Sequence, residues 1–199
     1  MKITYSQNEI TNIVIRNLLR MLFDRKLIND IEKERIKLGN LENKITFENT
    51  LNNDSVYSIY IINSELSSVV KNSSLDNYLS NNVNIHKIII IKMITKKACN
   101  QLNTEYRNTE FIFEHELMEH IPSKVFIPQH QLLSPEEKNE LLEKFNENNL
   151  SEIFTTDVMS RYYGAKSGDI FRIIRPSMTA GKSIFYRRVV KGSLDILFS

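Results

Sequence analysis

Disulfides, a secretory signal and a membrane span are all missing from this sequence. Cys99 is its one cysteine, so no internal disulfide can form, and this fits a reducing compartment. The first residues, MKITYSQNEI, lack the charged and then apolar pattern of a signal peptide. The longest apolar run surrounds residues 88–91 and is far shorter than the roughly 20 residues of a membrane-spanning helix. We therefore expect an intracellular protein with no membrane partner.

Motifs for catalysis and for cofactor binding are missing as well. The sequence has no G-x-G-x-x-G, no G-x-x-x-x-G-K-[ST] and no G-x-S-x-G pattern. The apolar run IIIIKM carries a lysine but no carboxylate that could hold a magnesium ion, as a nuclease strand would. We therefore expect no catalytic residues, no cofactor and no small-molecule substrate.

The histidines and the cysteine do not change this expectation. In HELMEH, His115 and His120 are five residues apart, so a helix would place them roughly 140° apart instead of on the common face that a zinc site needs. His86 and His130 are isolated, and we interpret them as surface or capping residues. Neighbouring lysines could lower the pKa of Cys99, but no histidine pattern accompanies it, so a buried structural role is favoured.

Charge is unevenly distributed, although the formal net charge is only +2. Residues 1–121 carry 15 basic and 15 acidic side chains, residues 122–157 carry 3 and 7, and residues 158–199 carry 8 and 2. The last segment therefore has a net charge of +6 and follows an acidic segment. Such a basic patch can attract nucleic-acid phosphates or an acidic protein surface, and charge alone does not choose between them.

The pattern of residues 1–121 predicts an α/β domain. Helical spacing predicts a helix over residues 10–22 and a second one over 27–39. Strands are predicted at residues 56–62, in TEFIFEHELM, and in IHKIIIIKM, whose continuous apolar run indicates burial on both faces. TKKACNQLNTEY is predicted to be a helix. Two prolines in HIPSKVFIPQH interrupt regular structure, so we place a domain boundary between residues 121 and 122.

Residues 122–199 predict a small α+β domain with a short β-sheet. Ser134 and Glu137 form a capping box at the start of a helix, and Asp157 caps a short helix that Gly164 ends in a left-handed conformation. Strands are predicted over residues 169–175, 183–190 and 194–198. A break with Pro176 and Gly181 separates the first two strands, so we expect a hairpin-like connection there.

Arginine and tyrosine crowd this hairpin and the short helix before it. In one interpretation, apolar residues such as Ile184 and Phe185 fill a small core and the arginines lie on the solvated face. In another, the cluster contacts a partner protein, because arginine and tyrosine are enriched at the centres of interfaces. A third interpretation is nucleic-acid binding, which requires aromatic side chains placed to stack and a continuous basic track.

Residues 130–190 closely resemble the C-terminal domain of the fifth subunit shared by eukaryotic nuclear RNA polymerases, which is equivalent to a small archaeal polymerase subunit. The resemblance lies in HQLLSPEEKNELLEKFN and SRYYGAKSGDIFRIIRPSMTAGKSIFYRRVV, where R-Y-Y-G-x-K-x-G-D, I-I-R-P-S-x-T-A-G and Y-R follow the order and spacing of the family. One departure is Val158, where the family usually has proline after the aspartate. NIVIRNLLRMLFDRKLI and HKIIIIKMITKKACNQL resemble more weakly the family's N-terminal jaw domain, which has a nuclease-like α/β fold without catalytic residues.

The resemblance implies a non-catalytic subunit of DNA-directed RNA polymerase. Its C-terminal domain would dock on the largest subunit beside neighbouring subunits, and its jaw would lie near downstream duplex DNA and contact it weakly and without sequence preference. Lys96 and Lys97, in the turn after the strand IHKIIIIKM, would lie near that DNA. The predicted interface residues are Arg161, Tyr162, Tyr163, Arg175, Pro176, Ser177, Thr179, Gly181, Tyr186 and Arg188.

Two alternatives stay open. The protein could be a stand-alone regulator that binds nucleic acid through its basic segment. Its origin could be a large DNA virus, which places it in the viral factory or virion, or a cellular eukaryote, which places it in the nucleus. An archaeal origin is disfavoured, because the archaeal counterpart consists of the C-terminal domain alone.

Overall fold

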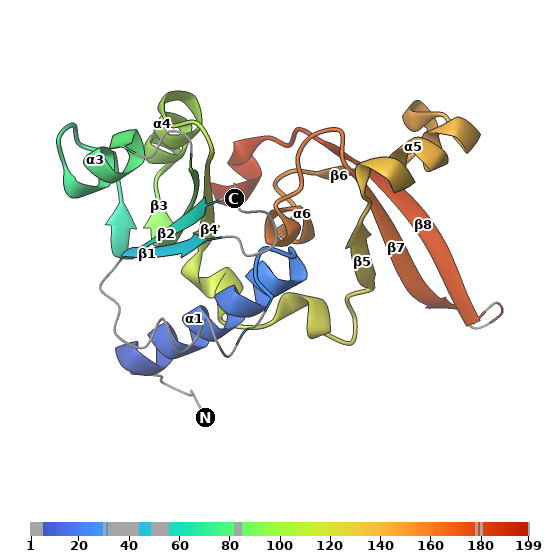
Figure 1. Cartoon of the computed structure of the whole chain (residues 1–199), viewed down its shortest axis with the longest axis horizontal. Coiled ribbons are helices and arrows are strands. Elements are labelled where there is room, and N and C mark those ends of the chain that lie inside the picture. The colour runs from blue at the N-terminus through green and yellow to red at the C-terminus, as the bar shows by residue number, and fades with distance from the viewer. Residues whose placement is uncertain are drawn as a thin grey trace. The chain divides into compact units, whose positions relative to one another are not determined.

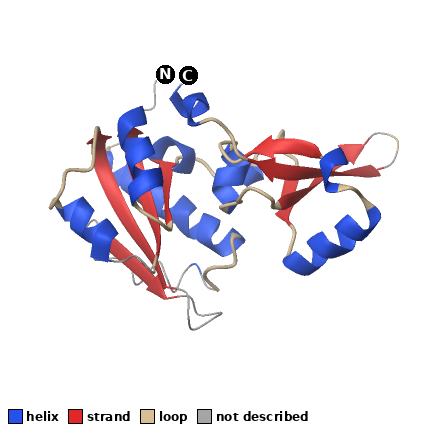
Figure 2. Ribbon diagram, turned by 90° about the horizontal axis from the view of Figure 1, so that it is seen from above, coloured by secondary structure: helices blue, strands red, loops and turns tan. Residues whose placement is uncertain are grey.

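The computed structural model describes residues 6–29, 31, 44–48, 56–81, 85–177, 179 and 181–198 (Figure 1). The chain divides into two compact units, Met1–Glu119 and His120–Ser199, called unit 1 and unit 2 below. Each unit combines helices with a four-stranded sheet (Figure 2), so the mixed α+β class is confirmed. The nuclease-like jaw and the independence of the two domains, 1–121 and 122–199, stay predictions.

Unit 1 is built around a sheet of order β1-β2-β3-β4, in which β2, β3 and β4 are parallel and β1 is antiparallel to β2. The four isoleucines 88–91 at the centre of β3 are each 1% exposed or less, so the predicted double-sided burial is confirmed. The elements are α1 (Gln7–Asp24), β1 (Lys44–Glu48), β2 (Val56–Leu66), α3 (Ser74–Asn81), β3 (His86–Ile94), α4 (Lys96–Glu105), β4 (Thr109–Phe113) and the 3-10 helix η1 (Glu114–Leu117).

Most expected elements of unit 1 are confirmed, with three differences. Helix α1 begins at residue 7, before the expected start, and its capping box of Ser6 and Glu9 is an S-x-x-E pattern that the prediction did not use. The second helix was expected from residue 27, but residues 27–29 are not helical, and residue 30 and residues 32–39 lie outside the described residues. The strand expected in TEFIFEHELM ends at Phe113, where Glu116 accepts a hydrogen bond from the Phe113 N–H and a 3-10 turn begins.

Unit 2 contains a sheet of order β5-β7-β8-β6, with β7 and β8 forming an antiparallel hairpin and β6 parallel to β8. Phe171, Ile173, Val189 and Ile153 form its buried core on one face of the sheet. The elements are the 3-10 helices η2 (Ile121–Ser123), η3 (Glu147–Asn149) and η4 (Leu194–Phe198), the helices α5 (Pro135–Lys144) and α6 (Val158–Tyr163), and the strands β5 (Gln129–Leu132), β6 (Ser151–Phe154), β7 (Ile170–Ser177) and β8 (Gly181–Val190).

The helix ends of unit 2 follow the sequence predictions. The Ser134 hydroxyl and the Glu137 carboxylate form the capping box of α5, and the Asp157 carboxylate accepts the Met159 N–H at 2.8 Å at the start of α6. Gly164 ends α6 with φ of 63°. The last predicted strand is wrong, because residues 194–198 form a 3-10 helix. The short strands β5 and β6 were not predicted.

Candidate interaction site

The hairpin of β7 and β8 is longer than the strands on either side of it. Strand β5 pairs with β7 only up to Ile174, and β6 pairs with β8 only from Arg187 onward. The outer part of the hairpin continues to the pair Ser177–Gly181, where Gly181 has φ of 69°, a conformation that favours glycine (Figure 1). Residues 175–177 and 181–186 therefore have a described neighbouring strand on one side only.

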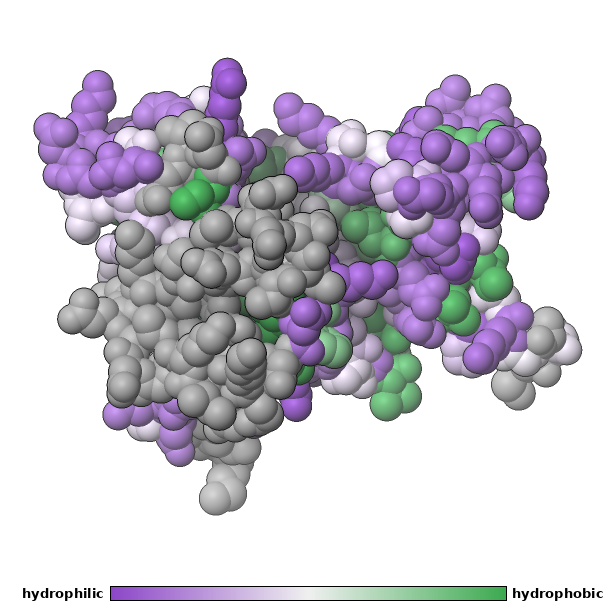
Figure 3. All heavy atoms as spheres, in the orientation of Figure 1, coloured by the Kyte–Doolittle hydropathy of each residue, from purple (hydrophilic) through white to green (hydrophobic). Residues whose placement is uncertain are grey.

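Large apolar side chains are exposed on and near this outer hairpin. Ile184 is 56% exposed and Phe185 is 47% exposed, so the interpretation that these two residues fill the core is wrong. Val125 and Phe126, in the segment that leads into β5, are exposed as well. Apolar and polar residues are interspersed on the visible side of unit 2 (Figure 3). Exposed apolar groups gathered in one place are typical of a surface that another protein covers.

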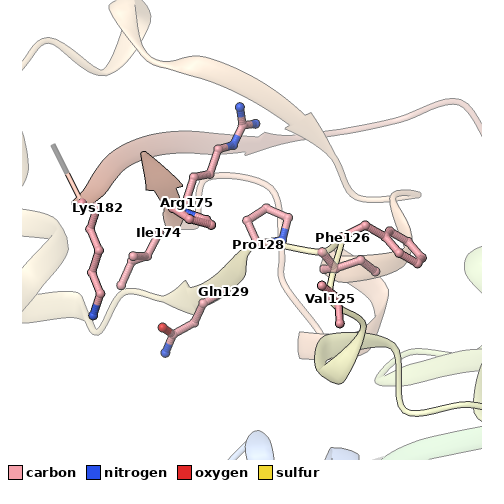
Figure 4. Close-up of a pocket in the computed structure, with 10 residues that line it drawn as sticks. Val125, Phe126, Pro128, Gln129, Ile174, Arg175 and Lys182 are labelled. Carbon is pink, nitrogen blue, oxygen red and sulfur yellow. The ribbon is translucent and has the colours of Figure 1, made fainter. Parts of the chain in front are cut away.

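An open groove of about 700 Å³ lies where these segments meet. The segment 125–129 and the outer parts of β7 and β8 line it, and Ile174, Gln129 and Lys182 point to the same side in Figure 4, while Arg175 points to the other. A groove with an apolar lining and a cationic rim suits a partner segment that carries apolar and acidic side chains.

Three cations of the hairpin have no acidic partner among the described residues: Arg175, Lys182 and Arg187. The Arg175 guanidinium lies over the ring of Phe185, 4.9 Å from its centroid, which keeps the exposed side chain close to the sheet. Burial lowers the pKa of His130, and the charges of Arg187 and Arg175 add to this in the same direction. The hairpin therefore presents uncompensated positive charge beside its apolar side chains.

Two other predicted interface residues have partners within unit 2. Tyr186 lies under Arg172, whose guanidinium is 5.9 Å from the ring centroid and 3.1 Å from the Glu137 carboxylate of α5. Arg188 pairs with Glu152 at 2.8 Å across β6 and β8. These contacts tie α5 and β6 to the hairpin, so both side chains help to hold unit 2 together.

The aromatic residues of α6 belong largely to the interior. As a predicted interface residue, Tyr162 was expected to have its side chain outside the core, but it is 5% exposed, so that expectation is wrong. Its ring packs edge-on against Tyr163 at 5.2 Å and His120 at 6.0 Å, and Tyr163 packs against Phe171 at 5.9 Å. Arg161, on the same helix, is partly exposed.

The remaining predicted interface residues lie at the outer end of the hairpin. Arg175, Pro176, Thr179 and Gly181 are exposed, and Ser177 is partly exposed with its hydroxyl 3.4 Å from that of Thr179. The structure therefore brings this part of the predicted set together at one place.

Lys96 and Lys97 were expected in a turn after the strand. They are instead the first two residues of α4, which Thr95 caps. Both are exposed. Cations are unfavourable at the positive end of a helix dipole, so their position does not stabilise the helix. Cys99, one turn later on the same helix, is fully buried, as predicted.

The histidines lie in separate surroundings. His115 stacks on Phe113 in unit 1 and His120 packs on Tyr162 in unit 2. No group of three or more His, Cys, Asp or Glu side chains that could hold a metal ion occurs among the described residues. His130 is partly buried, and its Nδ1–H donates to the Pro128 carbonyl at 2.7 Å.

His86 belongs to an ion cluster in unit 1. Its Nε2 lies 3.1 Å from a Glu110 carboxylate oxygen, and that oxygen also pairs with Arg25 at 2.5 Å. Burial alone would raise the pKa of Glu110, but the charge of Arg25 and the contact with His86 outweigh it and lower that pKa to about 2. The cluster joins the end of α1 to the starts of β3 and β4.

In the part of the chain that the structure describes, no helix is long and apolar enough to cross a membrane.

Sequence reasoning missed Val125, Phe126 and Lys182 as site residues. The signal for the first two was an apolar pair in a segment bounded by prolines, where neither a helix nor a strand could bury it. Lys182 follows the hairpin turn, and only the register of β7 and β8 shows that it lies on the open side.

Known proteins are similar to this chain in sequence. The family described as RNA polymerase Rpb5, C-terminal domain, matches residues 119–189. DNA-directed RNA polymerase subunit 5 of Acanthamoeba polyphaga mimivirus is 31% identical over 96% of this chain and 97% of its own length. The DNA-directed RNA polymerases I, II, and III subunit rpabc1 of Dictyostelium discoideum is 39% identical over 52% of this chain and 55% of its own length. DNA-directed RNA polymerase subunit Rpo5 of Archaeoglobus fulgidus is 44% identical over 33% of this chain and 90% of its own length.

These relatives place the chain among the non-catalytic subunits of RNA polymerases. The chain belongs to the DNA-directed RNA polymerase subunit 5 family. The family resemblance read from the sequence is confirmed, and so is the expectation that the chain is a non-catalytic member of an enzyme complex.

Proposed function

We propose that this chain is a subunit of a multisubunit DNA-directed RNA polymerase and that it docks on the largest subunit through the outer hairpin of unit 2. The observation that carries the proposal is the combination of exposed Ile184 and Phe185 with cations that lack acidic partners among the described residues. A protein that acts alone gains nothing from leaving such side chains exposed.

The outer part of the docking surface consists of residues that the fold does not need. Arg175, Pro176, Ser177, Thr179 and Gly181 lie at the end of the hairpin, outside the core of Phe171 and its neighbours. Tyr186 and Arg161 extend the surface toward α5 and α6. Tyr162, Tyr163 and Arg188 support it from within unit 2, because each has partners there.

Unit 1 has a different role in this proposal. It is the jaw, placed beside downstream duplex DNA, and Lys96 and Lys97 contribute a weak attraction to phosphates that does not depend on sequence. Both lysines are exposed at the start of α4, where the helix N-terminus adds positive potential. The protein acts where its polymerase acts, in a viral factory or virion or in a nucleus according to its origin.

The docking role is tested with single alanine variants of Arg175 and Tyr186 in the full chain. We expect each to weaken assembly with the largest subunit from the same genome by about 2 kcal/mol, as interface hot spots do. Lys166→Ala is the matched control, because Lys166 is an exposed cation before β7 and should leave assembly unchanged. Affinity is measured by biolayer interferometry on variants that circular dichroism shows to be folded, because Tyr186 also contacts Arg172 within unit 2. Unchanged affinity in both folded test variants contradicts docking through the hairpin.

The DNA role is tested with the double variant Lys96→Glu and Lys97→Glu in the assembled polymerase. We expect assembly to be unchanged and the elongation-complex lifetime to shorten, most at low salt and less as salt screens the charges. An effect of equal size at every salt concentration, or none at any, argues against DNA contact by these lysines.

A stand-alone nucleic-acid-binding regulator is the competing function, and the isolated chain distinguishes the two. A polymerase subunit should bind duplex DNA weakly or not at all at physiological salt. A regulator that uses the basic segment should shift it with a strong dependence on salt. Gel-shift titrations of the purified full chain on a duplex of arbitrary sequence provide this measurement.

A further inference from the structure

The outer hairpin has two open strand edges, and they differ chemically. Beyond the end of β5, the open edge of β7 consists of residues 175–177, and before the start of β6, the open edge of β8 consists of residues 181–186. Figures 1 and 2 show both long strands continuing past their short neighbours. An open edge presents backbone N–H and C=O groups that another extended chain can pair with.

Hydrogen bonds at the inner end of the hairpin fix which backbone groups face outward. The Val189 N–H donates to the backbone carbonyl of Asp169 at 2.7 Å on the β7 side, whereas the Val190 carbonyl accepts the Thr155 N–H at 2.9 Å on the β6 side. The register of β7 and β8 continues without a bulge to Gly181. In an antiparallel pair, the backbone groups of successive residues point alternately toward and away from the partner strand. Counted back from Val190, the N–H and C=O groups of Lys182 and Ile184 therefore point to the open side.

The same alternation places Pro176 on the open side of β7. The backbone groups of Ile170 face β5, since its carbonyl accepts the Leu133 N–H at 3.0 Å. Pro176 follows Ile170 by six positions, an even number, so its backbone groups face the same side. Proline has no N–H, so this edge offers no donor at its outward position. Of the two edges, only that of β8 offers both donors and acceptors.

Side chains around the β8 edge indicate what kind of segment would pair there. Ile184 and Phe185 are adjacent in the strand, so they lie on opposite faces of the sheet, and both are about half exposed. Lys182 shares a face with Ile184, and Arg187 shares a face with Phe185. Neither cation has an acidic partner among the described residues. A strand added at this edge would bring its side chains beside an apolar residue and a cation on each face.

We propose that the edge of β8 from Gly181 to Tyr186 binds an extended acidic segment of the docking partner as a fifth strand of the unit 2 sheet. The segment would lie in line with β6, pair with the backbone of Lys182 and Ile184, and place carboxylates beside Lys182 and Arg187. Backbone pairing supplies affinity and the alternating side chains supply selectivity, as in other cases of strand addition. This inference rests on the docking role proposed above and specifies the chemistry of the partner.

Hydrogen–deuterium exchange at single-residue resolution tests the proposal on the full chain, free and bound to the largest subunit from the same genome. In the free chain, the amides of Lys182 and Ile184 should exchange fast, while those of Ser183 and Phe185, which pair with β7, exchange slowly. In the complex, we expect the amides of Lys182 and Ile184 to slow at least tenfold. If the complex forms and both amides still exchange fast, the strand addition is overturned and docking survives. If no complex forms, the docking role fails and this inference fails with it.

Two variants provide a second, independent measurement. Ile184→Pro removes one outward N–H and leaves the bonds to β7, and it should weaken binding about tenfold, whereas Ile184→Val keeps the N–H and should change binding less than threefold. Lys182→Glu should weaken binding several-fold at low salt, and Lys166→Glu, an equal change of charge elsewhere, should not. Circular dichroism confirms that each variant is folded. If Ile184→Pro and Ile184→Val bind alike and the two lysine variants bind alike, the proposal is wrong.

Discussion

Unit 1 contains a largely buried cluster of charged side chains, whereas the hairpin of unit 2 carries cations without a described acidic partner. In unit 1, Arg25, Glu110 and His86 meet where α1 ends and β3 and β4 begin, and the Arg25 side chain is only 6% exposed. In unit 2, Arg175 and Arg187 have no acidic partner among the described residues. Ion pairs of the first kind hold a fold together, and cations of the second kind are available to another molecule.

Apolar side chains follow the same division. The central strand of unit 1 is fully buried at its four consecutive isoleucines, residues 88–91. The hairpin of unit 2 is buried only at its inner end, around Phe171 and Val189, and exposes Ile184 and Phe185 at its outer end. The two halves of β8 therefore differ: the inner half completes the core of its own unit, and the outer half has no described strand on the β6 side.

The strongest test of this division compares Phe171→Ala with Phe185→Ala. Phe171 is fully buried at the centre of the unit 2 core, so its truncation should cost about 3–5 kcal/mol of unfolding free energy. Phe185 is 47% exposed, and its truncation should cost less than about 1 kcal/mol but weaken docking. Urea unfolding followed by circular dichroism measures both. Equal losses of stability would show that the outer hairpin belongs to the fold.

The ion cluster of unit 1 gives a smaller effect with a defined pH dependence. The pKa of Glu110 is about 2 in the folded state against an ordinary value of 4.5, so its stabilisation is complete above pH 4.5 and is lost as the pH falls toward 2. The shift corresponds to roughly 3 kcal/mol at most. Glu110→Gln should lower stability at pH 7 by a similar amount and flatten the acid limb between pH 4.5 and 2. An acid limb that is as steep in the variant as in the wild type would contradict the role of the cluster.

The cap of α6 gives the smallest expected effect. Asp157→Ala leaves the Met159 N–H without its acceptor and should cost about 1 kcal/mol of unfolding free energy, while Asp157→Asn keeps an acceptor and should cost less. Because α6 packs on the inner core, docking by the folded variant should be unchanged. A folded Asp157→Ala variant that docks poorly would show that the docking surface extends beyond Arg161 to the start of this helix.

Local patterns predicted much of the fold. The continuous apolar run of β3 predicted a buried strand, and the residue types at Ser134, Asp157 and Gly164 predicted helix ends, because each of these depends on neighbours within a few positions. The strands β5 and β6 were missed, since they have four residues each and exist through pairing with β7 and β8. The apolar residues 194–198 suggested a strand, but no described strand pairs with them.

The candidate site was predicted only in part for the same reason. Arginine and tyrosine content drew attention to the hairpin, but composition does not distinguish Tyr162, which is buried, from Arg175, which is exposed. Arg25 and Glu110 are 85 positions apart, so the cluster that they form has no local signal. Which backbone groups of β8 point outward depends on its register with β7, and the pattern of a single strand does not contain that register.

The most direct test of the comparison between the units is to measure the affinity of each unit for the largest subunit from the same genome. Residues 120–199 and residues 1–119 are produced separately, and cooperative unfolding in urea establishes that each fragment is folded. We predict that residues 120–199 bind within about threefold of the full chain and that residues 1–119 do not bind detectably, because the docking role is assigned to the open hairpin of unit 2. A folded 120–199 fragment that does not bind, or a 1–119 fragment that binds as the full chain does, would contradict the account.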